Sequence, residues 1–444
     1  MGMGLTQTLR AIGGAALAGT LLLVTAPTTS ADSIRDSQWA LEAFDAEAVW
    51  QESTGEGVTV AVIDTGVNGL HPDLVGNVLK GKSFVDSERA DRQTSADHGT
   101  AMASLIAGHG SGRGNDEGIM GLAPDAKVLP LKNKTGDDTL DEGSASSADL
   151  IRYAVDQGAS VINMSFSSGP LSSDEEEAIA YAAEKDVALV ASAGNQGEGT
   201  VGYPAAAPGV VAVGAVDRAG DLWDRSNYGP EVMLTAPGVR IRSAGGATPY
   251  RMASGTSDAA AYVSGAVALL RAKFPDLTAG QIVNRLVKTA ALPEDLQGQS
   301  LPDERYGYGI IRPYRALTED IPAGPKQGPL KTPSAAVTDE SAAATAGNDG
   351  KTEEALAERN SRTNTILAVV GGGLLLLVAA VVVVVVVRRR GKDRNGGPPP
   401  GGPWTGGPGA GPGPGNAGWP QQPSHTYQSQ QNEHPHSSSN PYQH

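Results

Sequence analysis

The feature that most constrains this chain is an alternation of short apolar runs with helix-forming stretches between about Asp36 and Leu317. The apolar runs have the length of buried strands and cover residues 58–63, 128–131, 161–163, 187–191, 210–216 and 232–234. The helix-forming stretches cover residues 100–108, 149–157, 174–185, 257–274 and 278–289. This alternation predicts an α/β fold with a doubly wound, mostly parallel sheet and helices on both faces. In such folds the functional site lies beyond the carboxyl ends of the strands.

The first residue at such a strand end is Asp64, which is followed by Thr65 and Gly66. An aspartate at the end of a buried strand is a carboxylate held in place. The same Asp-Thr-Gly occurs in aspartic proteases, which need two such loops because two carboxylates share one proton. No second Asp-Thr-Gly or Asp-Ser-Gly occurs in the sequence, so this class would require a homodimer with one loop from each copy.

Two further candidates are His98, in DHGTAMASLIAG, and Ser257, in MASGTSDAAAYVSG. Taken alone, each fits a structural role, because a histidine at a helix start is commonly a cap or surface residue and a serine there is commonly an N-cap. Together with Asp64 they give the order Asp, His, Ser, each at an element boundary. Asn195, in ASAGNQG, follows another strand and by itself could be a turn residue.

Taken together, these segments resemble the active-site blocks of subtilisin-like serine proteases, the subtilases. The resemblance covers about residues 36–317 and implies a subtilisin-like fold with serine endopeptidase activity. It implies that Ser257 is the nucleophile, that His98 is the general base and that Asp64 orients the histidine. It also implies that Asn195 donates a hydrogen bond to the oxyanion.

The resemblance further implies a protein or peptide substrate, which subtilases bind as an extended strand between two backbone segments. Segments 163–170 and 192–195 resemble those two segments. The candidate substrate-binding residues are Ser165, Phe166, Ser167, Ala193 and Gly194. Side-chain preference does not follow from this match.

The block around the nucleophile departs from the family pattern at two positions. The family usually has Met directly after the serine and Pro shortly afterwards, where this chain has Asp258 and Ala261. A carboxylate in the first turn of a helix is favoured by the dipole, and it would also favour the protonated form of His98. We therefore expect an activity optimum at higher pH than that of an Asp258→Met variant, or else a weakened enzyme.

Composition excludes several classes of function. The net charge of −15 disfavours non-specific binding to nucleic acid, which requires many cations. The absence of cysteine excludes disulfides, thiolate metal sites and a cysteine nucleophile. No cofactor is required for the expected chemistry and no metal ligand is assigned. Structural calcium is possible, but residues 114–118 and 141–149 are weak candidates for holding it.

The two ends of the chain predict export and membrane anchoring. Residues 1–31 have a short basic start, an apolar stretch and a small-residue cleavage site after Ala31, as in a signal peptide. Residues 366–387 form an uncharged stretch long enough for one transmembrane helix, followed by three arginines that favour the cytoplasmic side. The expected order is signal peptide, protease domain with a short N-terminal extension (32–320), disordered stalk (321–365), span, and a disordered Gly/Pro-rich cytoplasmic tail (388–444).

This architecture resembles the mycosins, membrane-anchored subtilases linked to type VII secretion, and the short extension leaves no room for a long folding pro-domain. The predicted function is therefore an extracellular serine endopeptidase of the cell membrane, which could process type VII secretion substrates or contact the membrane complex of that system. The alternative is a structural subtilase-fold component of a secretion complex with little or no proteolysis. A receptor or adhesin with a signalling tail fits the topology but leaves His98 and Ser257 unexplained.

Overall fold

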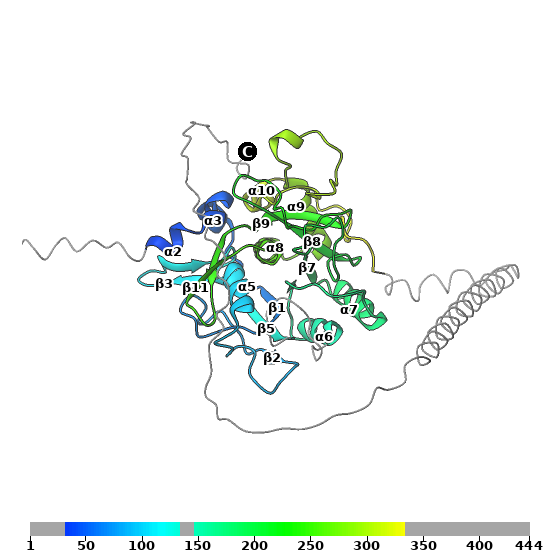
Figure 1. Ribbon diagram of the computed structural model, residues 1–444. Coiled ribbons are helices and arrows are strands. Elements are labelled where there is room, and N and C mark those ends of the chain that lie inside the picture. The colour runs from blue at the N-terminus through cyan, green and yellow to red at the C-terminus, as the bar shows by residue number, and fades with distance from the viewer. Residues whose placement is uncertain (1–31, 134–145, 334–444) are drawn as a thin grey trace, which may run out of the picture. The chain divides into compact units, whose positions relative to one another are not determined.

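The computed structural model describes residues 32–133 and 146–333 (Figure 1). The strands are β1 (Thr59–Asp64), β2 (Lys82–Ser83), β3 (His109–Ser111), β4 (Glu117–Met120), β5 (Lys127–Lys132), β6 (Val161–Met164), β7 (Ala188–Ser192), β8 (Val210–Val216), β9 (Val232–Pro237), β10 (Ile241–Ala244) and β11 (Tyr250–Ala253). The helices are α2 (Asp32–Asp36), α3 (Trp39–Phe44), α4 (Ala46–Glu52), α5 (Asp97–Ala107), α6 (Ser147–Asp156), α7 (Ser173–Glu184), α8 (Thr256–Lys273), α9 (Ala279–Thr289), α10 (Pro313–Thr318) and the 3-10 helix η1 (Glu294–Leu296).

One seven-stranded sheet organises these elements, in the order β2-β5-β1-β6-β7-β8-β9. Every neighbouring pair in it is parallel. The six predicted strands correspond to β1, β5, β6, β7, β8 and β9, and the five predicted helices to α5 through α9, so the predicted α/β fold is confirmed. Strand β2 and the hairpins β3–β4 and β10–β11 were not predicted, because Lys, Arg, Glu, Ser or Gly interrupts each of these short strands and leaves no continuous apolar run.

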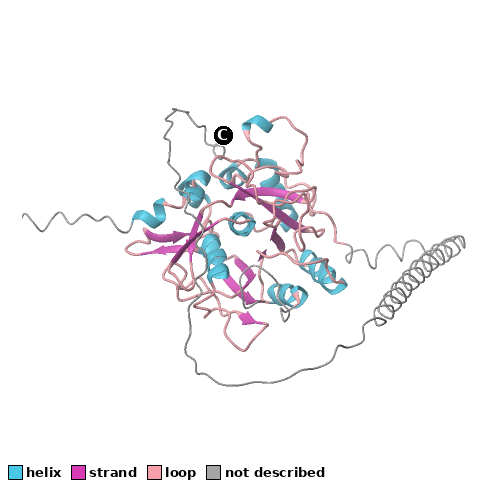
Figure 2. Cartoon of the chain, in the orientation of Figure 1, coloured by secondary structure: helices cyan, strands magenta, loops and turns pink. Residues whose placement is uncertain are grey.

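Helices cover both faces of the sheet, as predicted (Figure 2). On β1, Val60 and Val62 pack into the core that includes α5 and α8, whereas Ala61 and Ile63 pack into the core that includes α6 and α7. Successive side chains of a strand point to opposite faces, so one strand serves both cores. Because β1 lies between β5 and β6, its carboxyl end is the point at which the chain switches sides of the sheet.

The central helix α8 is mostly apolar and is buried continuously from Thr256 to Leu270. Its small residues let it approach the sheet and α5 closely. The surface helices instead begin with capping boxes, in which side chain and backbone exchange hydrogen bonds. These are Ser172 with Glu175 at α7, and Thr278 with Gln281 at α9.

The N-terminal extension packs against the domain rather than projecting from it. The guanidinium of Arg35 donates hydrogen bonds of 3.1 Å to the carbonyl oxygens of Glu117 and Gly118. The ring of Phe44 on α3 meets the ring of Tyr262 on α8 edge-on, with centroids 5.4 Å apart. The extension therefore contributes to the same core as the central helix.

At the other end, Arg285 on α9 bonds the last turn of α10 and the segment that follows it. Its guanidinium donates to the carbonyl oxygens of Ala316 at 2.8 Å, Glu319 at 2.6 Å and Ile321 at 3.2 Å. It also lies 4.2 Å from the centroid of the Phe274 ring. The first residues of the predicted stalk, 321–333, are thus described by the structure, and part of this stretch is bonded to α9.

The remaining topology predictions lie outside the described residues. The signal peptide (1–31), the transmembrane helix (366–387) and the cytoplasmic tail (388–444) fall in parts of the chain that the structure does not describe. Within residues 32–133 and 146–333, no helix combines the length and the apolar character that crossing a membrane requires. The membrane anchor remains a prediction from the sequence.

We predict that Arg285→Ala lowers the free energy of unfolding by roughly 2–4 kcal/mol, because three carbonyl groups lose a charged donor and the aromatic contact is lost. Urea unfolding of the full-length chain measures this change. Lys288→Ala, at an exposed position of the same helix, is the control and should change stability by less than about 0.5 kcal/mol. Equal losses in the two variants would contradict this role of Arg285.

Candidate active site

Asp64 and His98 form a buried pair at the carboxyl end of β1. Asp64 ends β1, and its Oδ1 accepts a hydrogen bond of 2.7 Å from the backbone N–H of Thr65. His98 is the second residue of α5, and its Nδ1 lies 2.8 Å from Oδ2 of Asp64. A carboxylate that binds Nδ1–H fixes the tautomer of the ring, so that Nε2 carries the lone pair. The pair can therefore present a proton acceptor at Nε2.

The pair depends on a close approach of the backbone at Gly99. The N–H of Gly99 donates to Oγ1 of Thr65 at 3.1 Å. A methyl group on Gly99 would lie 2.1 Å from the carbonyl oxygen of Gly66 and 3.2 Å from Cβ of Asp64. Since real Cβ atoms do not approach that closely, a glycine is required for α5 to reach the loop after β1.

Ser257 lies inside the first turn of α8 and does not cap it, because the N-cap is Gly255. Similarly, the N-cap of α5 is Ala96 rather than His98. The structural alternative, that these two residues are helix caps, is therefore wrong. Gly255 has no side chain to bond the first N–H groups of α8, which leaves them to other partners, and the helix dipole favours negative charge at that end.

The fold places the helix that carries Ser257 against the helix that carries His98, although the two are far apart in the sequence. Helix α8 packs directly against α5. His98 interacts electrostatically with Asp258, the residue after Ser257. The hydroxyl of Ser257 donates a long hydrogen bond of 3.4 Å to the carbonyl oxygen of Ser165 at the end of β6. A hydroxyl so weakly held can turn toward a base or toward a bound carbonyl.

Asn195 follows β7 and is oriented by Thr256. Its Oδ1 accepts hydrogen bonds from the backbone N–H of Thr256 at 2.9 Å and from the hydroxyl of Thr256 at 2.8 Å. A methyl group on Gly255 would lie 3.6 Å from the backbone N of Ser257 and 3.7 Å from Nδ2 of Asn195. Two N–H groups therefore border one small space beside Ser257, an arrangement able to bind a developing oxyanion.

A buried series of hydrogen bonds between polar side chains ends at the backbone of Ser257. The hydroxyl of Ser264 donates to Oδ1 of Asn163 at 2.9 Å, and Nδ2 of Asn163 donates to Oγ of Ser165 at 3.0 Å. The hydroxyl of Ser165 in turn donates to the carbonyl oxygen of Ser257 at 3.2 Å. These bonds fix β6 relative to the start of α8.

Thr256 and Ser264 belong to the site although the sequence did not predict them, and Asn163 was predicted only as the first residue of the segment 163–170. Thr256 orients Asn195 and also accepts a hydrogen bond of 3.2 Å from the N–H of Gly194. The sequence did indicate Asn163, because it stands at a strand end two residues before Ser165. No sequence pattern shows that Ser264 reaches Asn163, because the two are 101 positions apart in the chain.

The predicted substrate-binding residues lie at the ends of the adjacent strands β6 and β7. The side chains of Phe166 and Ala193 are 4% and 0% exposed, and Phe166 packs into the core with α6 and α7. The hydroxyl of Ser165 bonds the backbone of Ser257. What these two segments can offer a ligand is therefore mainly backbone, and their contact with substrate stays a prediction for Ser165, Phe166, Ser167, Ala193 and Gly194.

Asp258 places a carboxyl group beside the candidate nucleophile, where its side chain is buried. Burial raises the pKa of Asp258 from its ordinary 3.8 to about 6, and the positive charges of Arg251 and protonated His98 limit the rise. Its Oδ1 has no hydrogen-bond partner among the described residues. A carboxyl group with this pKa changes from neutral to negatively charged between acidic and neutral pH, so the charge beside Ser257 changes over that range.

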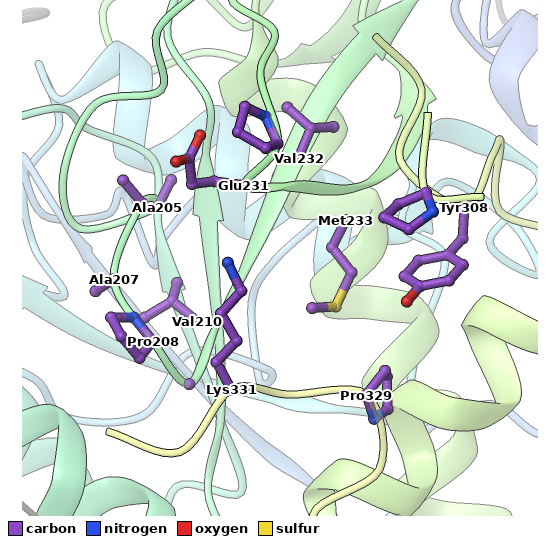
Figure 3. Close-up of a pocket in the computed structure, with 14 residues that line it drawn as sticks. Ala205, Ala207, Pro208, Val210, Glu231, Val232, Met233, Tyr308, Pro329 and Lys331 are labelled. Atoms are coloured by element: carbon purple, nitrogen blue, oxygen red, sulfur yellow. The ribbon is translucent and has the colours of Figure 1, made fainter. Parts of the chain in front are cut away.

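Other concavities lie away from this site. Figure 3 shows a pocket lined by Val210, Val232, Met233, Tyr308 and Lys331. Val210 and Val232 begin β8 and β9, so this pocket lies at the amino ends of the strands, opposite the paired Asp64 and His98. In the described part of the chain, no group of three or more His, Asp or Glu side chains is placed to hold a metal ion, and structural calcium stays untested.

We predict that Gly99→Ala lowers the free energy of unfolding by roughly 1–3 kcal/mol, because the added methyl group forces α5 away from the Gly66 carbonyl. Thermal and urea unfolding of the full-length chain measure the loss. The matched control is Gly169→Ala, where a methyl group would meet no atom within 4 Å. A Gly99→Ala variant as stable as this control would refute the close-approach argument.

Sequence comparison finds the Subtilase family model matching residues 55–309. A thermophilic serine proteinase of Bacillus sp. (strain AK1) is 38% identical over 272 residues, which are 61% of this chain and 64% of that protein. Subtilisin Savinase of Lederbergia lenta is 37% identical over 275 residues, which are 62% of this chain and 96% of the relative. The match thus spans less than two thirds of the first relative and nearly all of the second.

Structural comparison gives the same family. The crystal structure of MycP1 from the ESX-1 type VII secretion system superimposes with a TM-score of 0.57 at 31% sequence identity, covering 66% of this chain and 88% of MycP1. The predicted resemblance to subtilisin-like proteases and to mycosins is confirmed by these similarities. The matched residues 55–309 contain Asp64, His98, Asn195 and Ser257. The chain belongs to the subtilase family.

Proposed function

We propose that this chain is a membrane-anchored extracellular serine endopeptidase that hydrolyses peptide bonds through Asp64, His98 and Ser257. The observation that carries the proposal is the buried hydrogen bond of 2.8 Å between Nδ1 of His98 and Oδ2 of Asp64, beside the start of α8. Membership of a family whose relatives are named proteases supports the same conclusion.

In the proposed reaction, Oγ of Ser257 attacks the scissile carbonyl carbon while Nε2 of His98 removes its proton. Asp64 keeps the proton on Nδ1 and stabilises the imidazolium that forms. His98 then gives the proton to the leaving amine, and an acyl-enzyme remains on Ser257. A water molecule, deprotonated by His98, releases the second product and restores the hydroxyl.

The tetrahedral intermediates carry a negative oxygen, which the backbone N–H of Ser257 and Nδ2 of Asn195 are proposed to bind. These donors are fixed before substrate arrives, because Thr256 holds the amide oxygen of Asn195. Donors that need no reorganisation are the most effective in stabilising a transition state. The neighbouring strand ends are proposed to pair with an extended peptide.

We further propose that the natural substrates or partners belong to a type VII secretion system. The likeness to MycP1, a protein from the ESX-1 type VII secretion system, supports this role. The predicted signal peptide and span would hold the protease domain outside the cell membrane with the tail in the cytoplasm. The alternative function is a structural component of such a complex with little or no proteolysis, for which the buried carboxyl of Asp258 beside the nucleophile is the supporting observation.

We predict that a fluorophosphonate probe labels the full-length wild-type chain and does not label Ser257→Ala. The reagent reacts with a serine whose histidine is poised to take its proton. Ser254→Ala, which removes an exposed hydroxyl three residues away, should label fully. Labelling that survives in Ser257→Ala would refute the assignment, and an unlabelled folded wild type would favour the structural alternative.

We predict that Asn195→Ala lowers kcat for a labelled casein substrate by about 10²–10³ with little change in KM, since the lost donor acts in the transition state. Thr256→Val is the matched comparison, because it removes the hydroxyl that orients Asn195 and keeps the amide. It should lower kcat by less than about tenfold. Similar losses in both variants would mean that Asn195 acts by holding the structure.

A further inference from the structure

Asp258 is the buried titratable group that the proposed reaction leaves unused. It lies in the first turn of α8, directly after Ser257, and its side chain is 2% exposed. Most carboxyl groups that are buried in proteins are bonded to a cation or to several N–H groups. The described residues offer Oδ1 of Asp258 no such partner.

Oδ2 of Asp258 borders the space beside Ser257 that is proposed to hold the oxyanion. A methyl group on Gly255 would lie 3.2 Å from Oδ2 of Asp258, as well as 3.6 Å from the N of Ser257 and 3.7 Å from Nδ2 of Asn195. The carboxyl group and the two donors therefore surround the same point. A negative charge on Asp258 would act on the oxyanion through a poorly screened environment.

The groups that face Asp258 come from three elements. His98 on α5 and Arg251 on β11 interact with its charge, and both favour the ionised form. Tyr262 lies one turn later on α8, with a buried hydroxyl that has no bonding partner in the described residues, and burial raises the pKa of Tyr262 so that it stays neutral. Asp64, on β1, faces the opposite nitrogen of His98.

Charge interactions are reciprocal. If protonated His98 favours the ionised form of Asp258, then ionised Asp258 favours protonated His98 by the same free energy. The reaction requires that His98 is neutral before the attack and that the oxyanion is stabilised in the transition state. Ionised Asp258 opposes both requirements.

We propose that Asp258 is a positioning residue that restrains this site through its charge: its carboxylate holds the proton on His98 and opposes the oxyanion beside Ser257. The proposal rests on the proposed proteolytic function and adds a built-in limit to it. At low pH Asp258 is neutral but His98 is protonated, and at neutral pH the charge of Asp258 delays the loss of that proton. The wild-type enzyme therefore works best at alkaline pH and below the rate that its triad could reach.

The test compares wild type with Asp258→Asn, which keeps the shape of the side chain and removes its charge. The control is Glu42→Gln, which changes the net charge equally at an exposed position paired with Arg218. The rate of fluorophosphonate labelling and the hydrolysis of labelled casein are measured from pH 5 to 10 on the full-length chain. The imidazole of His98 is titrated in parallel by NMR with ¹⁵N-labelled histidine, with His98→Ala for assignment.

For Asp258→Asn we expect the acid limb of the rate profile and the NMR titration of His98 to move down by about 0.5–1 pH unit. We also expect kcat on the alkaline plateau to rise by roughly two- to tenfold, since the charge no longer opposes the oxyanion. The Glu42→Gln profile should coincide with wild type. A merely structural role for Asp258 would change stability or the plateau without moving the titration of His98.

Coincident titrations of His98 in wild type and Asp258→Asn would overturn the inference, even if the enzyme is active. A wild type that neither labels nor hydrolyses casein would overturn the proposed function instead. In that case a shifted His98 titration in Asp258→Asn would still support the charge coupling, because the NMR measurement needs no catalysis. The two failures are therefore distinguishable.

Discussion

The parallel sheet with β1 at its switch point is the constraint on which this structure depends. Parallel strands end at one edge, so the residues after β1, β6 and β7 meet there although they are far apart in the chain. The backbone pairing of β1 with β5 and β6 fixes where Asp64 sits. Every other group of the site is placed relative to that carboxylate.

Helix starts supply His98 and Ser257, and the loop after β7 supplies Asn195. Gly99 lets α5 approach the loop after β1, so that Asp64 reaches His98. Gly255, the N-cap of α8, has no side chain that could bond the first N–H groups of the helix. The N–H of Thr256 instead donates to Oδ1 of Asn195, which brings Asn195 to the start of α8. The dipole of a buried helix start favours an anion at this point. Asp258 lies in the same first turn, where we propose that its carboxylate opposes the oxyanion.

Much of the fold could be predicted, because six strands of the main sheet and five helices have clear apolar patterns. The short hairpins and the packed N-terminal extension could not, since their stability comes from partners elsewhere. Phe44, for example, is explained by its contact with Tyr262, 218 positions later in the chain. In the same way, the hydrogen bond between Asn163 and Ser264 joins residues 101 positions apart and could not be predicted from the sequence.

The sequence by itself determined the family, the order Asp64, His98, Asn195, Ser257 and the presence of a carboxyl group at Asp258, because these follow from residue types at element boundaries. The tertiary structure decided where each of them lies and which groups it bonds. It showed that His98 and Ser257 are not caps, that the amide oxygen of Asn195 is bonded to Thr256, and that Phe166 is buried. It also showed that Asp258 is buried and that its Oδ1 has no hydrogen-bond partner among the described residues, neither of which follows from the local sequence. The physical reason is that burial and hydrogen bonding depend on segments brought together by the sheet, whereas residue type and spacing are properties of the chain alone.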